Sequence, residues 1–441
     1  MSKNDDVTTR ALSGFMELLP EEQIVFNNML DVICDAYETF GFTPIDTPVL
    51  ERSNVLLAKA GGETEKQIYQ FKKGDSELAM RFDLTVPLAR YVVEHYGDLT
   101  FPFRKYAVGK VFRGERAQAG RFREFYQCDI DVVGDEVLDL RFDAEIPSVI
   151  YTIFKKLGFD AFTIRVNNRK IFNGLFEGLE IAESETEIMR SIDKLEKIGR
   201  ESVEIELNEM GISPEKIASI FTFLTLSGNP KQVLDELQKL EIVNEKFDTG
   251  VAELKKVTEM MEQFGVPEAN FVIDLTIARG LDYYTGTVYE TRLDEYPEIG
   301  SVCSGGRYDD LASAYTNKKL PGVGISIGLT RLFDQLRKRD LIKVASATKT
   351  KVLVVPMTDD IDGSIAIATV LRSNDISTEI SFTQGKLKKR LAYANKKGIP
   401  FVIFIGEDEI AKGVYMLKDF VNGTQEVLDE IALLQKLKEI I

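Results

Sequence analysis

The spacing of apolar residues changes several times along the chain, and each change predicts a different element. Between residues 21 and 40, apolar side chains such as Ile24 and Ile33 recur near helical spacing, and Gly41 follows at the position of a C-cap. We therefore expect a helix over 21–40, followed by a short strand in GFTPIDTPVLE that ends at Pro48.

Two later stretches, residues 100–133 and 271–293, alternate with a period of two between glycines, which is typical of antiparallel strands. Residues 183–258 lie between them and are rich in Glu, Lys and Leu, a pattern that indicates several amphipathic helices around the turn LSGNPKQ. We interpret 183–258 as a helical insertion in a sheet domain. The prediction for residues 1–340 is thus an α+β domain built on an antiparallel sheet.

After residue 340 the chain changes character again. The segment IKVASATKTK indicates a linker, and strand-like and helix-like stretches then alternate: KVLVVPM, a helix over 363–373, STEISF, a helix over 385–397, and PFVIFIG. This order is typical of a small α/β domain with a mostly parallel sheet. We assign that second domain to residues 350–441.

Composition limits where the protein acts and what it binds. At 441 residues the chain is too long for one compact core, and its formal net charge of −16 disfavours indiscriminate attraction to nucleic acid or anionic membrane. A polyanion would have to meet local basic patches. The first residues lack the apolar run of a signal peptide, and no later run is long enough to span a bilayer, so we expect a cytoplasmic protein with no membrane partner.

The scarcity of certain residue types excludes several kinds of chemistry. Cys34, Cys128 and Cys303 are scattered and form no CxxC spacing, which supports neither a disulfide framework nor a structural zinc site. His95 is the only histidine. A histidine base, a catalytic dyad or a His-rich metal site is therefore nearly excluded, no metal site is expected, and His95 is predicted to be a surface residue at a helix end.

Two predicted strands carry polar side chains on one face. In RFREFYQCDIDVV, residues 121–133, alternation puts Phe125, Gln127 and Asp131 on the face opposite Ile130, and in MRFDLTV it puts Asp83 and Thr85 opposite Phe82. A solvated sheet face would explain this pattern. The mixture of guanidiniums, an aromatic ring, an amide and carboxylates favours a binding site, because such groups can hold phosphates, a base and an ammonium group.

The segment VFRGERAQAGRFREF, residues 111–125, reads as a hairpin with Arg113 and Glu115 at one root and Arg121 at the other. Planar guanidiniums bind phosphate oxygens in bidentate fashion, so the hairpin is suited to a triphosphate, although a solvated turn of mixed charge remains the alternative. In PGVGISIGLTRLFDQL, a strand leads into a helix whose first turn holds Arg331. A helix start favours anions, which again points to a phosphate-rich ligand.

These stretches resemble the signatures of class II aminoacyl-tRNA synthetases, and among them histidyl-tRNA synthetases. GFTPIDTPVLE is similar to the first signature of the class, FRGE with RFREF to the second, and GISIGLTRLF to the third. ARGLDYYTG and SGGRYDDL are similar to two signatures peculiar to the histidine enzymes. The resemblance extends over nearly the whole chain, including a terminal anticodon-binding domain.

The resemblance implies a role for each matching residue. Arg113, Arg279 and Arg331 would be catalytic and hold the phosphates of ATP and the attacking carboxylate, with Arg121 at the γ-phosphate and Glu115 and Phe125 reading and stacking on adenine. The amino-acid end of histidine would meet Asp83, Thr85 and Gln127, and its imidazole would face Asp131, Tyr284 and Tyr308. Arg116 and Gln118 would reach the acceptor end of tRNA.

The implied activity is ATP-dependent ligation of L-histidine to tRNA(His) by a homodimer, with Mg²⁺ accompanying ATP. The family more often has Glu at the position of Thr330, and some members have Glu at the positions of Asp83 and Asp131, which puts those individual contacts in question. The basic segment GKLKKRLAYANKK could face tRNA or simply be a solvated helix. Two other functions stay open: a catalytically silent paralogue that acts as a regulatory subunit or a histidine or tRNA sensor, and a synthetase for another amino acid of the subclass.

Overall fold

The computed structural model describes residues 8–58, 63–116, 120–240, 242–277, 284–342, 347–383 and 385–440. The chain divides into two compact units, one of residues 1–16 and 29–339 and the other of residues 17–28 and 340–441. Each unit has its own sheet and its own buried apolar core.

The described part of the first unit is built on an eight-stranded sheet with the order β1-β5-β6-β11-β10-β9-β7-β8. Neighbouring strands are antiparallel except for the β1–β5 and β7–β8 pairs, which are parallel. The strands are β1 (Thr43–Pro44), β5 (Phe103–Phe112), β6 (Glu124–Val133), β7 (Phe162–Asn168), β8 (Phe271–Ile273), β9 (Thr287–Leu293), β10 (Cys303–Tyr308) and β11 (Gly322–Ile327).

The two faces of this sheet differ in chemistry. On β6, Cys128, Ile130 and Val132 are fully buried and point to one face, where the hydroxyl of Tyr37 from helix α1 (Pro20–Thr39) donates to the main-chain oxygen of Cys128 at 2.8 Å. Helix α5 (Arg141–Lys156) packs on the same face. The side chains that alternate with these apolar residues point to the other face, which we call the front face of the sheet.

Short elements surround one end of the front face. A three-stranded sheet has the order β2-β4-β3, and the loop after β4 leads directly into helix α4. These elements are β2 (Leu50–Arg52), α2 (Ser53–Leu57), α3 (Glu63–Gln67), β3 (Gln70–Lys73), β4 (Ser76–Met80), α4 (Thr85–Glu94) and, after β11, α12 (Leu329–Lys338).

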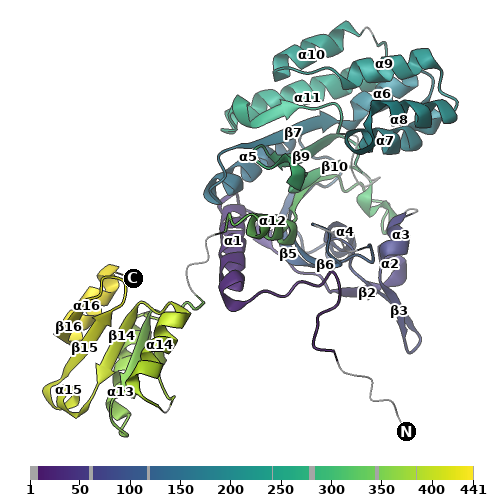
Figure 1. Cartoon of the computed structure of the whole chain (residues 1–441). Helices are drawn as coiled ribbons and strands as arrows, with labels where there is room; N and C mark the ends of the chain where they lie inside the picture. Colours follow the sequence, from purple (N-terminus) through teal and green to yellow (C-terminus); the bar gives the residue numbers. More distant parts are fainter. Residues whose placement is uncertain are drawn as a thin grey trace. The chain divides into compact units, whose positions relative to one another are not determined.

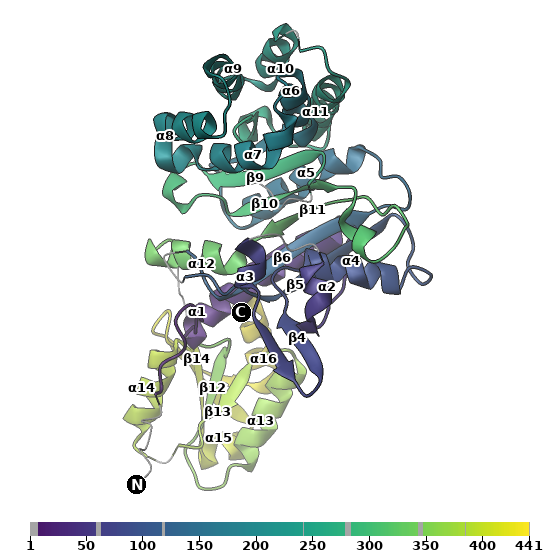
Figure 2. The ribbon, with the colours of Figure 1, turned by 90° about the vertical axis from the view of Figure 1, so that its right-hand side faces the viewer.

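Helices fill the chain between β7 and β8. The charged, Leu-rich pattern predicted those within 183–258, but not α6 (Arg169–Gly178), which precedes that range. Figures 1 and 2 show them gathered beyond β7, on the opposite side of the unit from α2, α3 and β3. The last of them ends at Gln263, beyond the predicted end at residue 258. They are α6 (Arg169–Gly178), α7 (Glu185–Asp193), α8 (Leu195–Glu209), α9 (Pro214–Leu224), α10 (Pro230–Lys239) and α11 (Glu245–Gln263).

The second unit has a five-stranded sheet with the order β13-β12-β14-β15-β16, in which β12 is parallel to β13 and β14 and the last two strands are antiparallel. Its elements are β12 (Val352–Pro356), α13 (Asp362–Ser373), β13 (Thr378–Ile380), α14 (Leu387–Lys397), β14 (Phe401–Ile405), α15 (Glu407–Lys412), β15 (Val414–Asp419), β16 (Gln425–Asp429) and α16 (Glu430–Ile440). Among the described residues, no helix combines the length and the apolar character that crossing a bilayer requires.

The predicted fold class, an antiparallel sheet with inserted helices followed by a small α/β unit, is confirmed, and His95 does follow the end of α4. Three local predictions are wrong. The strand expected to end at Pro48 is paired only over Thr43–Pro44, and within 271–293 the three residues of β8 pair in parallel.

The third correction concerns MRFDLTV, whose predicted strand ends at Met80. The carboxylate of Asp83 accepts a hydrogen bond from the main-chain N–H of Val86 at 3.0 Å and so satisfies a donor in the first turn of α4. Pro87 has no N–H to give to a ladder and is well tolerated in the first turn of a helix. Local capping therefore outweighs the alternating pattern here.

Candidate functional site

A cavity of about 1380 Å³ lies over the front face of the sheet. It is larger than the pockets of roughly 300–1,000 Å³ that usually hold one small molecule, and it has room for two ligands side by side. Of the residues predicted from the sequence, the cavity is lined by Asp83, Thr85, Arg113, Glu115, Arg121, Phe125, Gln127, Tyr284 and Arg331.

Three of the arginines predicted to hold the phosphates reach the cavity. Arg113 and Arg121 come from the connection between β5 and β6, and Arg331 comes from the first turn of α12, where Gly328 is the N-cap. The guanidinium of Arg113 lies 4.2 Å from the centre of the Phe82 ring and 5.0 Å from that of Phe125. Such cation–π contacts hold a guanidinium in place before any ligand arrives.

The remaining hairpin residues are placed by contacts with one another. Arg121 forms an ion pair of 3.2 Å with Glu115, so the candidate phosphate-binding group and the candidate adenine-reading group are partners in this structure. Arg331 donates to the main-chain oxygen of Ile299. Thr330, where the family more often has Glu, is buried, and its hydroxyl accepts from the main-chain N–H of Tyr126 at 2.8 Å, so it supports β6.

Gln127 presents an unsatisfied acceptor to the cavity. Its side chain is 9% exposed, and its amide nitrogen donates to the hydroxyl of Ser326 at 2.7 Å. The amide oxygen, Oε1, has no hydrogen-bond partner. A buried acceptor of this kind costs free energy unless a ligand donor reaches it, and an ammonium group would satisfy it.

Asp131 and Tyr308 meet across two glycines of β11. Asp131 on β6 and Tyr308 on β10 flank β11, and the Tyr308 hydroxyl donates to Oδ1 of Asp131 at 3.0 Å. A Cβ atom at Gly324 would lie 2.3 Å from that oxygen, and a Cβ atom at Gly322 would lie 2.3 Å from the Tyr308 ring. The glycines of PGVGIS therefore allow this contact. Asp131 and Tyr308 are buried and are not among the lining side chains.

Two charged residues beside this contact had no predicted role. Lys105 on β5 is fully buried, and its Nζ lies 2.6 Å from Oδ2 of Asp131. Asp129 is also buried, and it lies two residues before Asp131 on the same face of β6. Burial raises the pKa of Asp129 to about 7 although Lys105 and Ser326 oppose the rise, and burial likewise raises the pKa of Asp131 and of Asp83.

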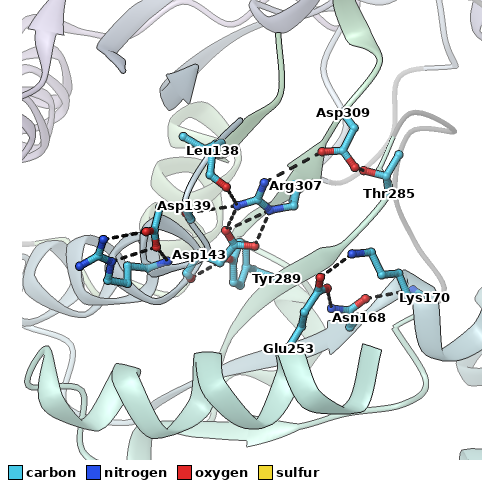
Figure 3. Close-up of polar contacts among 11 residues, drawn as sticks. Leu138, Asp139, Asp143, Asn168, Lys170, Glu253, Thr285, Tyr289, Arg307 and Asp309 are labelled. Atoms are coloured by element: carbon cyan, nitrogen blue, oxygen red, sulfur yellow. Dashed lines mark hydrogen bonds and ion pairs between the residues drawn. The ribbon is translucent and has the colours of Figure 1, made fainter. Parts of the chain in front are cut away.

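A buried ion pair fixes the strand that carries Tyr308 (Figure 3). Arg307 points to the face opposite Tyr308, and its Nη2 lies 2.6 Å from Oδ2 of Asp143 on α5. The main-chain oxygen of Arg307 accepts from the N–H of Thr285 at 2.9 Å, and the hydroxyl of Thr285 donates to Asp309 at 2.6 Å. These bonds join the segment after Tyr284 to β10, so the two tyrosines of the predicted histidine signatures are brought to the same region.

The inserted helices also line the cavity, which sequence reasoning missed. Sequence patterning indicated helices from residue 183 onward and not α6, and the position of all of them over the sheet depends on contacts between distant residues. One such contact is the pair of hydrogen bonds that Arg292 on β9 donates to Glu196 on α8. The lining residues from α6, from α7 and just after α7 are Arg169, Asn173, Glu185, Thr186, Met189, Arg190, Asp193 and Lys194.

Some predicted site residues are not brought to the cavity by the described structure. Arg279 and Gln118 lie outside the described residues. Arg116 is exposed and is not among the lining residues. The roles of these three residues therefore stay predictions.

Comparison with known proteins agrees with the signatures over the whole chain. Residues 14–332 match the family model of histidyl-tRNA synthetases, and residues 351–440 match that of an anticodon binding domain. The histidine–tRNA ligase of Clostridium tetani is 57% identical to this chain over 425 residues, which cover 96% of this chain and 97% of that protein.

Solved structures agree as well. The crystal structure of histidyl-tRNA synthetase from Nostoc sp. PCC 7120 matches with a TM-score of 0.90 and 42% identity, and the match covers 99% of this chain and 100% of that one. An ATP phosphoribosyltransferase regulatory subunit/histidyl-tRNA synthetase from Bacillus halodurans matches with a TM-score of 0.74 over 91% of this chain and 99% of that one, but at 22% identity this likeness shows the fold alone. On the family match and the 57% identity, the chain belongs to the histidyl-tRNA synthetase family.

Proposed function

We propose that this protein ligates L-histidine to tRNA(His) in two steps, forming histidyl-adenylate from histidine and ATP and then transferring the histidyl group to the tRNA 3′ end. The observation that carries the proposal is the single cavity that collects Arg113, Arg121 and Arg331 together with Asp83 and Gln127. Cations suited to a triphosphate and acceptors suited to an ammonium group thereby share one site. Membership of the family supplies the reaction.

In the first step, an oxygen of the histidine carboxylate forms a bond to the α-phosphorus of ATP, and the bond from that phosphorus to the bridging oxygen of the leaving pyrophosphate breaks. Negative charge gathers on the α-phosphate as the bond forms. Arg113 and Arg279 are proposed to stabilise that charge, and Arg331, with Arg121, to hold the γ-phosphate. Catalysis then rests on positioning and fixed charge, without a covalent enzyme intermediate.

Recognition of the two substrates divides along β6. Glu115 and Phe125 are proposed to read and stack on adenine, while Asp83, Thr85 and Gln127 receive the amino-acid end of histidine. Asp131, Tyr284 and Tyr308 are proposed to select the imidazole. A site built to hydrogen-bond such a ring leaves buried polar groups unpaired when an analogue lacks the ring nitrogens, and this can discriminate by about 10⁴ to 10⁵.

Magnesium is expected to arrive with ATP. Within the described residues, no group of three or more His, Cys, Asp or Glu side chains could hold a metal ion. Mg²⁺ commonly binds through substrate phosphates, water and one or two carboxylates, so a dedicated protein site is not needed. No step above depends on a protein-bound metal.

The proposal extends to organisation and partners. Residues 1–340 would form the catalytic domain, interrupted by 183–258, and residues 350–441 would bind the anticodon. Arg116 and Gln118 would contact the acceptor end, and the protein would act as a cytoplasmic homodimer.

The test is ATP–pyrophosphate exchange with each amino acid in turn, followed by charging of tRNA(His). We expect exchange that depends on histidine and on no other amino acid. Exchange driven by a different amino acid would identify another synthetase. A folded protein with no exchange at all would favour the silent paralogue, and either result would overturn the proposal.

A further inference from the structure

Lys105 occupies an unusual position for a lysine. It lies on β5 with its side chain fully buried, in direct register with Asp131 on β6. The same row continues across the sheet through Gly324 on β11 and Gly306 on β10, neither of which adds a side chain. On its other side Lys105 pairs with Thr43 of the edge strand β1. Asp131 is therefore the charged neighbour of the ammonium group in this row, with Nζ 2.6 Å from Oδ2.

Stability alone is a poor explanation for this pair. Taking two charges out of water costs about as much as their attraction returns, and apolar side chains of similar size often stabilise a fold equally well. A buried ammonium group does change the ionisation and the orientation of its partner. It favours the ionised carboxylate over the neutral acid, and it fixes the direction in which that carboxylate points.

We propose that Lys105 is a positioning residue for histidine selection, one that keeps the Asp131 carboxylate ionised and aligned with Tyr308 so that it accepts a hydrogen bond from an imidazole N–H. This inference rests on the proposed function and deepens it. Lys105 forms an ion pair with Oδ2 and Tyr308 donates a hydrogen bond to Oδ1, so each carboxylate oxygen has one partner from the protein and can still accept from the substrate.

The surrounding charges show why the ammonium group is needed. Asp131 is close to two other buried carboxylates, Asp83 and Asp129, and burial raises the pKa of all three while Lys105 opposes the rise for Asp129 and Asp131. Other ionisable groups also interact with these carboxylates: Arg113 and Tyr315 with Asp83, Tyr308 with Asp131, and Tyr37, Cys128 and Cys303 with Asp129. Loss of Lys105 would raise the pKa of Asp131 further and shift it toward the neutral acid, which offers a donor where the imidazole N–H needs an acceptor.

The first test compares Lys105→Met and Lys105→Arg with the wild type in histidine-dependent pyrophosphate exchange between pH 6 and 9. For Lys105→Met we expect the KM for histidine to rise about tenfold or more, the effect of losing a charge-assisted hydrogen bond, with the KM for ATP unchanged. The acid limb of kcat/KM for histidine should move to higher pH. Free histidine titrates identically in both assays, so a difference between variants belongs to the enzyme. Lys105→Arg keeps the charge and should restore most of the loss.

Arg104→Met is the matched control. Arg104 is the next residue on β5, points to the opposite face and forms a 2.8 Å ion pair with Glu145. Its loss should lower the melting temperature and leave the KM for histidine and the pH limb unchanged. An equal rise in the histidine KM for Arg104→Met and Lys105→Met would overturn the proposal, because the effect would then be structural.

A second test uses the Asp131→Asn variant as the starting protein. It covers the case in which Lys105→Met alone does not fold because Asp131 is left as an unpaired buried charge. Asp131→Asn removes that charge, and Lys105→Met is then added to it. If Lys105 acts only through Asp131, the second substitution costs nothing further in kcat/KM for histidine. A further tenfold loss would overturn the inference. A wild type without histidine-dependent exchange would overturn the proposed function and this inference together, whereas an active wild type with a normal Lys105→Met variant would overturn this inference alone.

Discussion

Removal of the Tyr308 hydroxyl probes the proposed imidazole end of the cavity most directly. Tyr308→Phe keeps the ring that packs over Gly322 and deletes only the donor that lies 3.0 Å from Oδ1 of Asp131. A hydrogen bond to a charged group contributes about 1.5–3 kcal/mol. At about 1.4 kcal/mol for each factor of ten, kcat/KM for histidine should fall roughly 10- to 150-fold.

The assay is pyrophosphate exchange with histidine and ATP varied separately. The loss should fall on the histidine parameters, because Tyr308 contacts Asp131 and is not among the residues that line the cavity beside the arginines. Tyr37→Phe is the matched control, since it deletes a buried hydroxyl that donates to the Cys128 carbonyl on the opposite face of β6. It should lower stability by about 1 kcal/mol and leave the histidine KM unchanged. Equal changes in the KM values for histidine and ATP in Tyr308→Phe would refute the assignment.

Three further predictions concern the sheet beside Asp131, the cavity and an inserted helix. Gly324→Ala should destabilise the protein by about 1–3 kcal/mol in denaturant unfolding and weaken histidine binding in calorimetry. The added Cβ would lie 2.2 Å from the Ile130 carbonyl oxygen and 2.3 Å from the Asp131 carboxylate, so normal histidine binding would contradict this prediction. Arg113→Met should lower kcat for exchange about a hundredfold or more with an unchanged melting curve, and a normal kcat would remove Arg113 from the mechanism. Burial alone raises the pKa of Glu196, but hydrogen bonds from Arg292 and Arg165 lower it overall. The ionised Glu196 should therefore stabilise the fold above about pH 5, and this stabilisation should be lost as the pH falls further. Glu196 is partly exposed, so Glu196→Gln should lower the free energy of unfolding by at most about 1 kcal/mol at pH 7 and speed hydrogen exchange in α8. Unchanged hydrogen exchange would show that this ion pair does not hold the helix.

The sequence predicted those parts of the structure that depend on residues close together along the chain. The alternation in 121–133 predicted a strand with a polar face, which the structure has over Glu124–Val133, and the sequence Gly328 to Arg331 correctly predicted a helix start at the cavity. Each depends on the geometry of a single element. MRFDLTV has the same alternation and misled us, because the Asp83 side chain caps a helix there.

The residues that were missed depend on register and on tertiary contacts. The stretch FRKYAVGKVF has no clear apolar face, so nothing in it marks Lys105 as buried. Its partner follows from the pairing of β5 with β6, and a shift of one residue would have placed Asp131 opposite another side chain. The cavity-lining residues of α7 were missed for a similar reason, since no local pattern indicates which part of the sheet an inserted helix covers.

The arrangement along β6 solves a problem that any site for these two substrates would face. Arginines for the phosphates and carboxylates for the amino acid would neutralise one another if they stood close together, as Arg121 and Glu115 already do at 3.2 Å. The length of β6 separates Asp131 from the arginines of the hairpin, whereas Asp83 stays close enough to Arg113 for that arginine to oppose the rise in its pKa. From Phe125 to Asp131 the front face of β6 carries a side chain at every second residue, and six residues at about 3.3 Å each extend roughly 20 Å. On the proposed assignment, adenine lies at the Phe125 end and the imidazole at the Asp131 end. The order of side chains along one strand therefore sets the order of the ligands. The lysine that balances the buried carboxylates, Lys105, comes from the neighbouring strand β5 at the end far from the phosphates.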